Sequence, residues 1–275
     1  MIPKVIHYCW FGRNPLPPLA CKCIESWRRY CPDYEIKEWN EDNFDVNCIP
    51  YTAEAYKAGK YAFVSDYARF VILYEHGGVY FDTDVEVIKD LNEFIGAGPF
   101  MGCEKAYSPS AMPANLCVAP GLGIGAPKGL EFYREIINLY KDRHFILPDR
   151  TLNLETVVTI TTRLLCSKGL RNTDEVQQVD GILIYPKEYL CPKDYGTKRT
   201  TLKSNTLTIH HYDGSWDTPK RQYENHLRER FKYLPYAINC YLSAVIAVLK
   251  YEGVLGWIKR KSKGLFSKKT TINKI

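Results

Sequence analysis

The fold is decided around His76-Gly77-Gly78-Val79-Tyr80-Phe81-Asp82-Thr83-Asp84. Before this stretch, apolar residues recur at three- and four-residue spacings between residues 61 and 76, which predicts a helix with one buried face. The two glycines end that helix, and the apolar triplet after them predicts a short buried strand. The two aspartates therefore stand where a strand ends.

The beginning of the chain predicts a β-α-β unit. Residues 4–10 are rich in strand-forming side chains, residues 19–30 predict a helix, and residues 34–39 alternate like a second strand. Together with the helix and strand that precede Asp82, this order predicts an α/β fold. Further strands and helices are predicted at 100–104, 128–143, 153–168, 182–185 and 206–212.

We expect two parts in the chain: residues 1–230 as one domain, and residues 231–275 as a C-terminal helix with a basic tail. Residues 236–249 carry no charge, but Lys250 and Glu252 interrupt this run before the roughly 20 apolar residues that a membrane span requires. The helix is expected either to dock on the domain or to lie in a membrane interface.

The charge of the chain points to membranes rather than nucleic acid. The formal net charge is +6, and the excess is concentrated after Ile258, with six Lys or Arg and no acid between Lys259 and Lys269. Such a tail suits an anionic membrane surface, and a solvated disordered tail is the alternative. We expect no nucleic-acid partner and a possible peripheral membrane contact through this tail.

Cysteine usage predicts a reducing compartment. The chain has ten cysteines, opens without an apolar signal segment and contains no Cys-x-x-Cys pair. We therefore expect reduced thiols, a cytoplasmic location that includes the cytoplasmic face of the membrane, and no structural zinc site.

The acidic pair suits a hard divalent cation, because two carboxylates can hold Mg²⁺ or Mn²⁺ while the ion also binds phosphate oxygens. Alternate residues of a strand point to opposite faces, so Asp82 and Asp84 can share a site only where the strand bends or ends. Asp66 and Arg69 lie three apart on the preceding helix and share a face. The plainer interpretations are a solvated acidic turn and an ordinary surface ion pair.

Three motifs in this order resemble the Asp-x-Asp sugar-binding glycosyltransferases of family 32: residues 2–12, residues 65–69 and residues 76–84, with a further match at residues 210–216. That family includes yeast mannosyltransferases and bacterial capsule and lipopolysaccharide sugar transferases, with clostridial glucosylating toxins as distant relatives. The resemblance implies a GT-A fold with a mixed, mostly parallel sheet, retention of configuration, a divalent metal that is usually Mn²⁺, and a nucleotide-sugar donor, for which we favour a UDP-sugar.

The resemblance also implies roles for individual residues. Asp66 and Arg69 would hold the hydroxyls of the donor sugar, Asp82 would contact ribose or sugar, and Asp84 would ligate the metal. Trp10 would stack on the nucleobase, and Ile6 and His7 at the end of the first strand would border the nucleotide. His211 or His210 would complete the metal site. The remaining contacts to the donor would come from Asn115 and, at the diphosphate, from Ser215 and Trp216.

Several of these roles have alternatives. Trp10 could be a core aromatic residue, and Asn115 could cap a turn. His210 and His211 are adjacent, so on a strand only one can face the site, and we favour His211 because it is nearer the turn. The toxins carry Asn at this point. For a retaining reaction that uses a carboxylate nucleophile, Glu155 is a candidate, although an acid at a helix N-terminus is also expected there.

The predicted function is transfer of a sugar to a glycan acceptor, expected to be lipid-linked, in surface polysaccharide biosynthesis. A non-catalytic nucleotide-sugar or carbohydrate-binding module is one alternative. A phosphatase of the haloacid dehalogenase type is another, but its pattern requires Thr or Val two residues after the second aspartate, where this chain has Glu86.

Overall fold

The computed structural model describes residues 1–105, 116–214 and 217–262. Contacts divide the described chain into two compact units. Unit 1 comprises Met1–Pro192 and Leu202–His211, and unit 2 comprises Lys193–Thr201 and the described residues from Tyr212 onward. The boundary expected at residue 230 stays a prediction.

Unit 1 is an α/β unit with two sheets. Its elements follow one another as β1 Val5–Cys9, α1 Pro18–Tyr30, β2 Glu35–Trp39, α2 Pro50–Lys57, α3 Tyr61–His76, β3 Gly78–Tyr80, β4 Val85–Val87, α4 Asn92–Gly96, β5 Phe100–Gly102, η2 Pro120–Leu122, β6 Ile124–Ala126, α5 Glu131–Tyr140, α6 Val157–Ser167, β7 Gln177–Val179, β8 Ile182–Tyr185, α7 Lys187–Leu190 and β9 Thr208–His210. The α/β fold and the mixed sheet expected from the sequence are confirmed.

The larger sheet has seven strands in the order β2-β1-β3-β6-β5-β8-β7. β1 is parallel to both β2 and β3, and β5 is parallel to β8, whereas the pairings of β6 and β7 are antiparallel. The second sheet pairs β4 with β9, so it joins the chain just after the acidic pair to residues more than a hundred positions later. This pairing brings the two predicted metal-ligating segments together.

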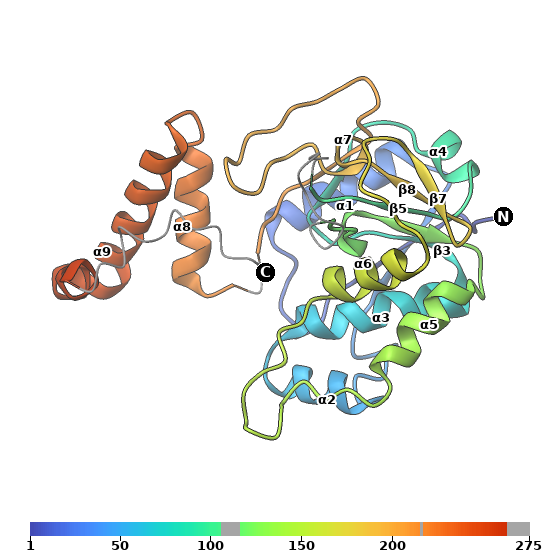
Figure 1. The fold of residues 1–275 in the computed structure, drawn as a ribbon, viewed down its shortest axis with the longest axis horizontal. Helices are drawn as coiled ribbons and strands as arrows, with labels where there is room; N and C mark the ends of the chain where they lie inside the picture. Colours follow the sequence, from blue (N-terminus) through green and yellow to red (C-terminus); the bar gives the residue numbers. More distant parts are fainter. Residues whose placement is uncertain (106–115, 215–216, 263–275) are drawn as a thin grey trace. The chain divides into compact units, whose positions relative to one another are not determined.

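Helices α1 and α3 lie on either side of the larger sheet (Figure 1). Alternate residues of a strand point to opposite faces. Tyr8 meets Trp27 of α1, with ring centroids 5.8 Å apart, whereas Cys9 belongs to the core cluster that includes Tyr67 and Phe70 of α3. α3 packs against α5 and reaches β1, β3 and β6, so it is the central helix of its layer.

Unit 2 contains α8 Pro219–Arg230 and α9 Tyr236–Ser262. α9 is interrupted at Gly253, whose backbone has φ 69° and ψ −175°, so it consists of two helical segments.

Candidate active site and metal centre

The sharp change of direction after β3 gathers the acidic pair. α3 ends at Gly77, whose N–H donates to the Leu73 carbonyl 2.8 Å away, and β3 then runs beside β1. The chain leaves the sheet at Asp82, and the Val85 N–H donates to the Asp82 carbonyl at 3.0 Å, closing a turn around Thr83 and Asp84. The two aspartates are thus on a turn between two strands, where both can serve one site.

α3 supplies a buried guanidinium to this turn. The Arg69 Nη2 lies 2.9 Å from Asp66 Oδ1 and 3.3 Å from Asp82 Oδ1, and its side chain is only 4% exposed. The Arg69 Nε donates to the Ser65 carbonyl at 3.0 Å. The pair is therefore no exposed surface ion pair: Arg69 joins the helix acid to the turn acid in the interior.

Asp82 is held from a second side by Tyr80. The Tyr80 hydroxyl donates to Asp82 Oδ1 at 3.0 Å, and the Arg69 guanidinium lies over the Tyr80 ring, 4.8 Å from its centroid. Asp66 accepts a hydrogen bond from the Val157 N–H at the start of α6, where the helix dipole favours negative charge. Three elements thus fix these two carboxylates.

Three carboxylates, those of Asp66, Asp82 and Asp84, lie close to a single guanidinium in this site. Burial raises the pKa of Asp66 to about 6, Arg69 opposes this and Asp82 adds to it. Burial also raises the pKa of Asp82, with Asp84 adding to the shift. Burial alone would lower the pKa of Arg69, but the neighbouring acids, Asp82 foremost, raise it, so the guanidinium stays charged.

Asp82, Asp84 and His210 form a group suited to a metal ion. Each offers one ligand atom, and these atoms all lie within 4.8 Å of one another. His210 ends β9, opposite Val85 of β4, and its Nε2 lies 3.2 Å from Asp84 Oδ1. Burial alone would lower the pKa of His210, but Asp84 raises it. Two carboxylates and one imidazole are donors that Mn²⁺ accepts, so the residues fit the group implied by the resemblance.

Gly121 of η2 lies so close to Asp82 that a larger residue there would meet the carboxylate. The Asp82 N–H donates to the Gly121 carbonyl at 3.2 Å. A Cβ on residue 121 would overlap Asp82 Oδ2 and lie 3.0 Å from Asp82 Cγ. Sequence reasoning missed this contact, because it joins positions 39 residues apart. The signal was the glycine itself, next to a proline in an apolar setting.

Residues 17–100 match the glycosyltransferase sugar-binding region containing the DXD motif. The match includes Asp66, Arg69 and the acidic pair, and it confirms over this segment the resemblance drawn from the sequence. Residues 17–100 are thus similar to the sugar-binding region of glycosyltransferases.

Curated relatives carry the same kind of name. An uncharacterized glycosyltransferase of Acanthamoeba polyphaga mimivirus is 35% identical over 111 residues, which are 38% of this chain and 44% of the relative. Inositol phosphoceramide mannosyltransferase 3 of Schizosaccharomyces pombe is 28% identical over 148 residues, 52% of this chain and 40% of the relative. The chain thus spans less than half the length of these relatives.

Solved glycosyltransferase structures are also similar to this chain. One takes part in glycosylation of the major capsid of PBCV-1, with TM-score 0.45 and 12% identity over 84% of this chain and 100% of that chain. The PaToxG glycosyltransferase has TM-score 0.44 and 18% identity over 61% of this chain and 70% of that chain.

The structure brings His210 to the acidic pair, not the expected His211. The Nε2 of His211 lies 2.8 Å from Glu86 Oε2, and Glu86 is itself 3.0 Å from Lys22 Nζ of α1. Adjacent residues at a strand end point to opposite sides. The pairing of β9 with β4 determines that His210 is the residue facing the aspartates. The nearness of His211 to the turn did not predict this.

Ile6 and His7 have buried side chains that leave no surface for a nucleotide. Ile6 is fully buried, and His7 is 1% exposed. Its Nδ1 accepts from Trp39 Nε1 at 3.0 Å and its Nε2 donates to the Gly77 carbonyl at 2.9 Å. Burial lowers the pKa of His7 to about 4, so the ring is neutral and acts as a brace between β2 and the glycine turn. In this structure both side chains serve the interior, and the expected contact of this strand end with a nucleotide stays a prediction.

Trp10 is a half-buried residue just past the end of β1. Its Nε1 donates to the Asn14 carbonyl at 2.6 Å, and it is absent from the buried core. The core interpretation is therefore the weaker one, and stacking on a base stays a prediction. Asn115, Ser215 and Trp216 lie outside the described residues.

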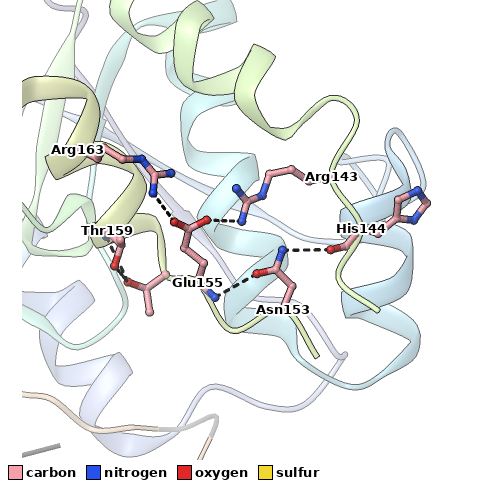
Figure 2. A network of polar contacts seen from close by, with 7 residues as sticks. Arg143, His144, Asn153, Glu155, Thr159 and Arg163 are labelled. Carbon is pink, nitrogen blue, oxygen red and sulfur yellow. Dashed lines mark hydrogen bonds and ion pairs between the residues drawn. The ribbon is translucent and has the colours of Figure 1, made fainter. Parts of the chain in front are cut away.

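Glu155 is held by two guanidinium groups (Figure 2). Arg143 Nη2 donates to Glu155 Oε2 and Arg163 Nη1 donates to Glu155 Oε1, both at 2.7 Å. Burial would raise the pKa of Glu155, but these two donors lower it. Thr156, the next residue, is the N-cap of α6. A carboxylate engaged at both oxygens is a poor nucleophile, so this arrangement favours a structural role at the helix start.

Proposed function

We propose that this chain is a metal-dependent glycosyltransferase of the GT-A type that takes a sugar from a nucleotide-sugar donor with retention of configuration. The observation that carries the proposal is the cluster in which Arg69 joins Asp66 to Asp82 while Asp84 and His210 complete a metal-binding group. The match of residues 17–100 to a glycosyltransferase sugar-binding region supports it.

Asp82, Asp84 and His210 would hold the metal ion, Mn²⁺ or Mg²⁺. When bound, such an ion supplies positive charge to a departing diphosphate. Burial raises the pKa of Asp82, Asp84 adds to the shift, and the ion would offset the repulsion between these two carboxylates. His210 would hold the ion through its neutral imidazole.

Asp66 and Arg69 orient the donor sugar in this proposal. Asp66 stays ionised beside Arg69 near neutral pH and can accept hydrogen bonds from sugar hydroxyls. Asp66, Asp82 and the Ser65 carbonyl fix the Arg69 guanidinium. It therefore holds the two carboxylates in one geometry, and little rearrangement of the site is needed when the donor binds.

Both same-face attack by the acceptor and double displacement retain configuration, and the ion pairs of the carboxylates favour the first. Asp66 and Asp82 are paired with Arg69, and Glu155 with Arg143 and Arg163. A covalent glycosyl ester would separate such a carboxylate from its cation inside the protein, which is costly. The leaving phosphate is then the group that takes the acceptor proton.

For the substrates we propose a UDP-sugar donor and a lipid-linked glycan acceptor at the cytoplasmic face of a membrane, in surface polysaccharide synthesis. A relative named inositol phosphoceramide mannosyltransferase supports a lipid-borne acceptor and makes a mannosyl donor the first competitor to test. Peripheral membrane contact through the basic C-terminal end fits this setting.

The experiment is a screen of nucleotide sugars for Mn²⁺-dependent hydrolysis, repeated with Asp84→Ala. We expect hydrolysis of one donor by the parent chain and a loss of at least about a hundredfold in the variant, because a charge that stabilises the transition state is removed. Asp174→Ala, at an exposed aspartate of unit 1, is the matched control. A folded Asp84→Ala chain with normal turnover would refute the metal role. Donor binding that Mn²⁺ tightens without turnover, with or without acceptor glycans, would favour the binding module.

A further inference from the structure

α8 and α9 form an antiparallel pair within unit 2. At one end, Asn239 Nδ2 donates to the Arg228 carbonyl at 3.0 Å. At the other end, Lys220 is ion-paired with Glu252, and Lys250 Nζ lies 3.7 Å from the centroid of the Tyr223 ring. The charged helix α8 therefore runs along the first segment of α9, from near its beginning to near its end.

The polarity of this pair is inverted relative to a water-soluble helix pair. The residues of α9 buried in the structure are Asn239, Ser243, Ala247 and Val248, and the first three have the spacing i, i+4, i+8. Ser243 Oγ donates to Asn239 Oδ1 at 3.1 Å, and Asn239 in turn bonds α8. Two polar and one small side chain thus share this face with one valine, where an amphipathic helix would place mainly large apolar side chains.

The apolar side chains of α9 are on the outside. On the first segment, one stripe with helical spacing is exposed: Ile238, Leu242 and Leu249. Beyond the break at Gly253, three more apolar side chains are exposed, Val254, Leu255 and Ile258, of which Leu255 reaches 83%. Exposed apolar side chains gathered on one helix in this way mark a site that binds a protein or a membrane.

Charge and aromatic side chains around this surface indicate what covers it. Residues 219–262 contain nine Lys or Arg and three Glu. One of the three acids, Glu252, is paired with both Lys220 and Arg260, and these lower its pKa to about 2. Tyrosine side chains favour the boundary between water and lipid. Four of them are exposed in this region: Tyr233, Tyr236, Tyr241 and Tyr251.

We propose that α9 lies in the plane of an anionic lipid bilayer, with the apolar stripe at Ile238, Leu242 and Leu249 in the acyl boundary and the basic residues at the headgroups. Apolar burial and attraction to anionic headgroups together give such helices their affinity. This inference goes beyond the proposed donor chemistry and stands apart from it, because vesicle binding needs neither donor nor metal.

An in-plane position fits better than a span. By length and composition α9 could cross a membrane, with a mean hydropathy of 1.4 over its best window. However, a spanning α9 would take the paired, charged α8 into hydrocarbon, which is expensive for each arginine and lysine. The break at Gly253 also leaves a first segment shorter than the usual span of about 20 residues.

The test measures sedimentation of the full chain with vesicles of phosphatidylcholine alone and of phosphatidylcholine with phosphatidylglycerol. We expect binding to the anionic vesicles and about thirtyfold weaker binding for Lys259→Ser/Lys261→Ser, which lacks two surface charges. Ile238→Glu/Leu249→Glu should bind about a hundredfold more weakly or not at all. The matched control is Leu139→Glu/Leu202→Glu, at two exposed leucines of unit 1, which should bind like the parent chain.

Depth is measured by quenching of tryptophan fluorescence with brominated lipids. For Leu249→Trp, which places a tryptophan near the middle of α9, we expect stronger quenching by bromine near the headgroups than by bromine at the bilayer centre, with the parent chain as the reference. Stronger quenching at the centre would mean a span and would overturn the in-plane proposal. Absence of binding to anionic vesicles, or equal binding by Ile238→Glu/Leu249→Glu, would overturn it altogether.

Two other occupants of the stripe have their own signatures. If a second copy of the chain covers it, the parent chain is a dimer in lipid-free buffer and Ile238→Glu/Leu249→Glu is a monomer. If unit 1 covers it, the same variant loses thermal stability or donor hydrolysis without lipid. Either result would overturn the membrane proposal, whereas an unchanged monomer with unchanged hydrolysis supports it.

Discussion

The active-site cluster of unit 1 and the helix pair of unit 2 bury polar groups for opposite reasons. In unit 1, charged groups are buried within an apolar core, where Arg69 and its two acids form a site of fixed geometry. In unit 2, Asn239 and Ser243 are buried beside Ala247 and Val248, where they hold α9 to α8, while large apolar side chains such as Ile238 and Leu255 are exposed. Buried polarity marks chemistry in the first region and an inverted surface in the second. Substitutions in each region should therefore have different costs.

The largest effect is expected for Arg69→Met. It leaves Asp66 and the partly buried Asp82 without their shared cation, so the free energy of unfolding should fall by about 3 kcal/mol, together with loss of donor hydrolysis. Urea unfolding at neutral pH measures the first. The matched control is Arg163→Met, whose guanidinium also pairs with a carboxylate but is largely exposed, with an expected cost of about 1 kcal/mol or less. Equal losses for the two variants would mean that the Arg69 cluster is no buried site.

The next effect concerns the pH dependence of stability in the absence of divalent ions. The pKa of Asp66 is about 6 in the folded chain against an ordinary value of 3.8, so the unfolded chain ionises at lower pH. The stability that this difference contributes is present below about pH 4 and is lost as pH rises to about 6, by up to about 3 kcal/mol. Asp66→Asn removes this slope, whereas Asp174→Asn keeps it. Parallel unfolding curves for Asp66→Asn and the parent chain between these pH values would contradict the burial of Asp66.

Gly121→Ala should affect activity more than stability. Its Cβ overlaps Asp82 Oδ2, so the carboxylate must move by a fraction of an ångström or more, and donor hydrolysis should fall up to about a hundredfold. The stability cost of such overpacking is about 1–3 kcal/mol. Gly96→Ala is the matched control, because a Cβ there meets nothing within 4 Å. Normal hydrolysis by Gly121→Ala would show that the position of Asp82 tolerates change.

Local patterns in the sequence predicted the frame of unit 1 well. The helix expected at residues 61–76 is α3, with the same bounds, and the strand expected at residues 182–185 is β8. These elements have strong periodicity and clear stops, such as the glycines after His76. The strand end that carries Asp82 and Asp84 followed from the same signals.

The features that local patterns missed depend on contacts between distant segments. The choice of His210 over His211 depends on how β9 pairs with β4, and the need for glycine at 121 depends on the approach of η2 to the turn. The burial of His7 depends on Trp39 and Gly77. The outward apolar stripe of α9 could not be predicted either, because only the partner helix α8 shows which side of α9 is inside.

The smallest effect is expected where the same substitution is made in both regions. Ile72→Ala in α3 removes a side chain that is 1% exposed and should cost about 2–5 kcal/mol. Ile238→Ala in α9 removes one that is 49% exposed, and without vesicles it should change the free energy of unfolding by about 0.5 kcal/mol or less. Vesicle binding by Ile238→Ala should nevertheless weaken, since the lost area contributes only when lipid covers it. If both alanines cost the same in lipid-free buffer, the stripe is already covered by protein, and the contrast between the two regions fails.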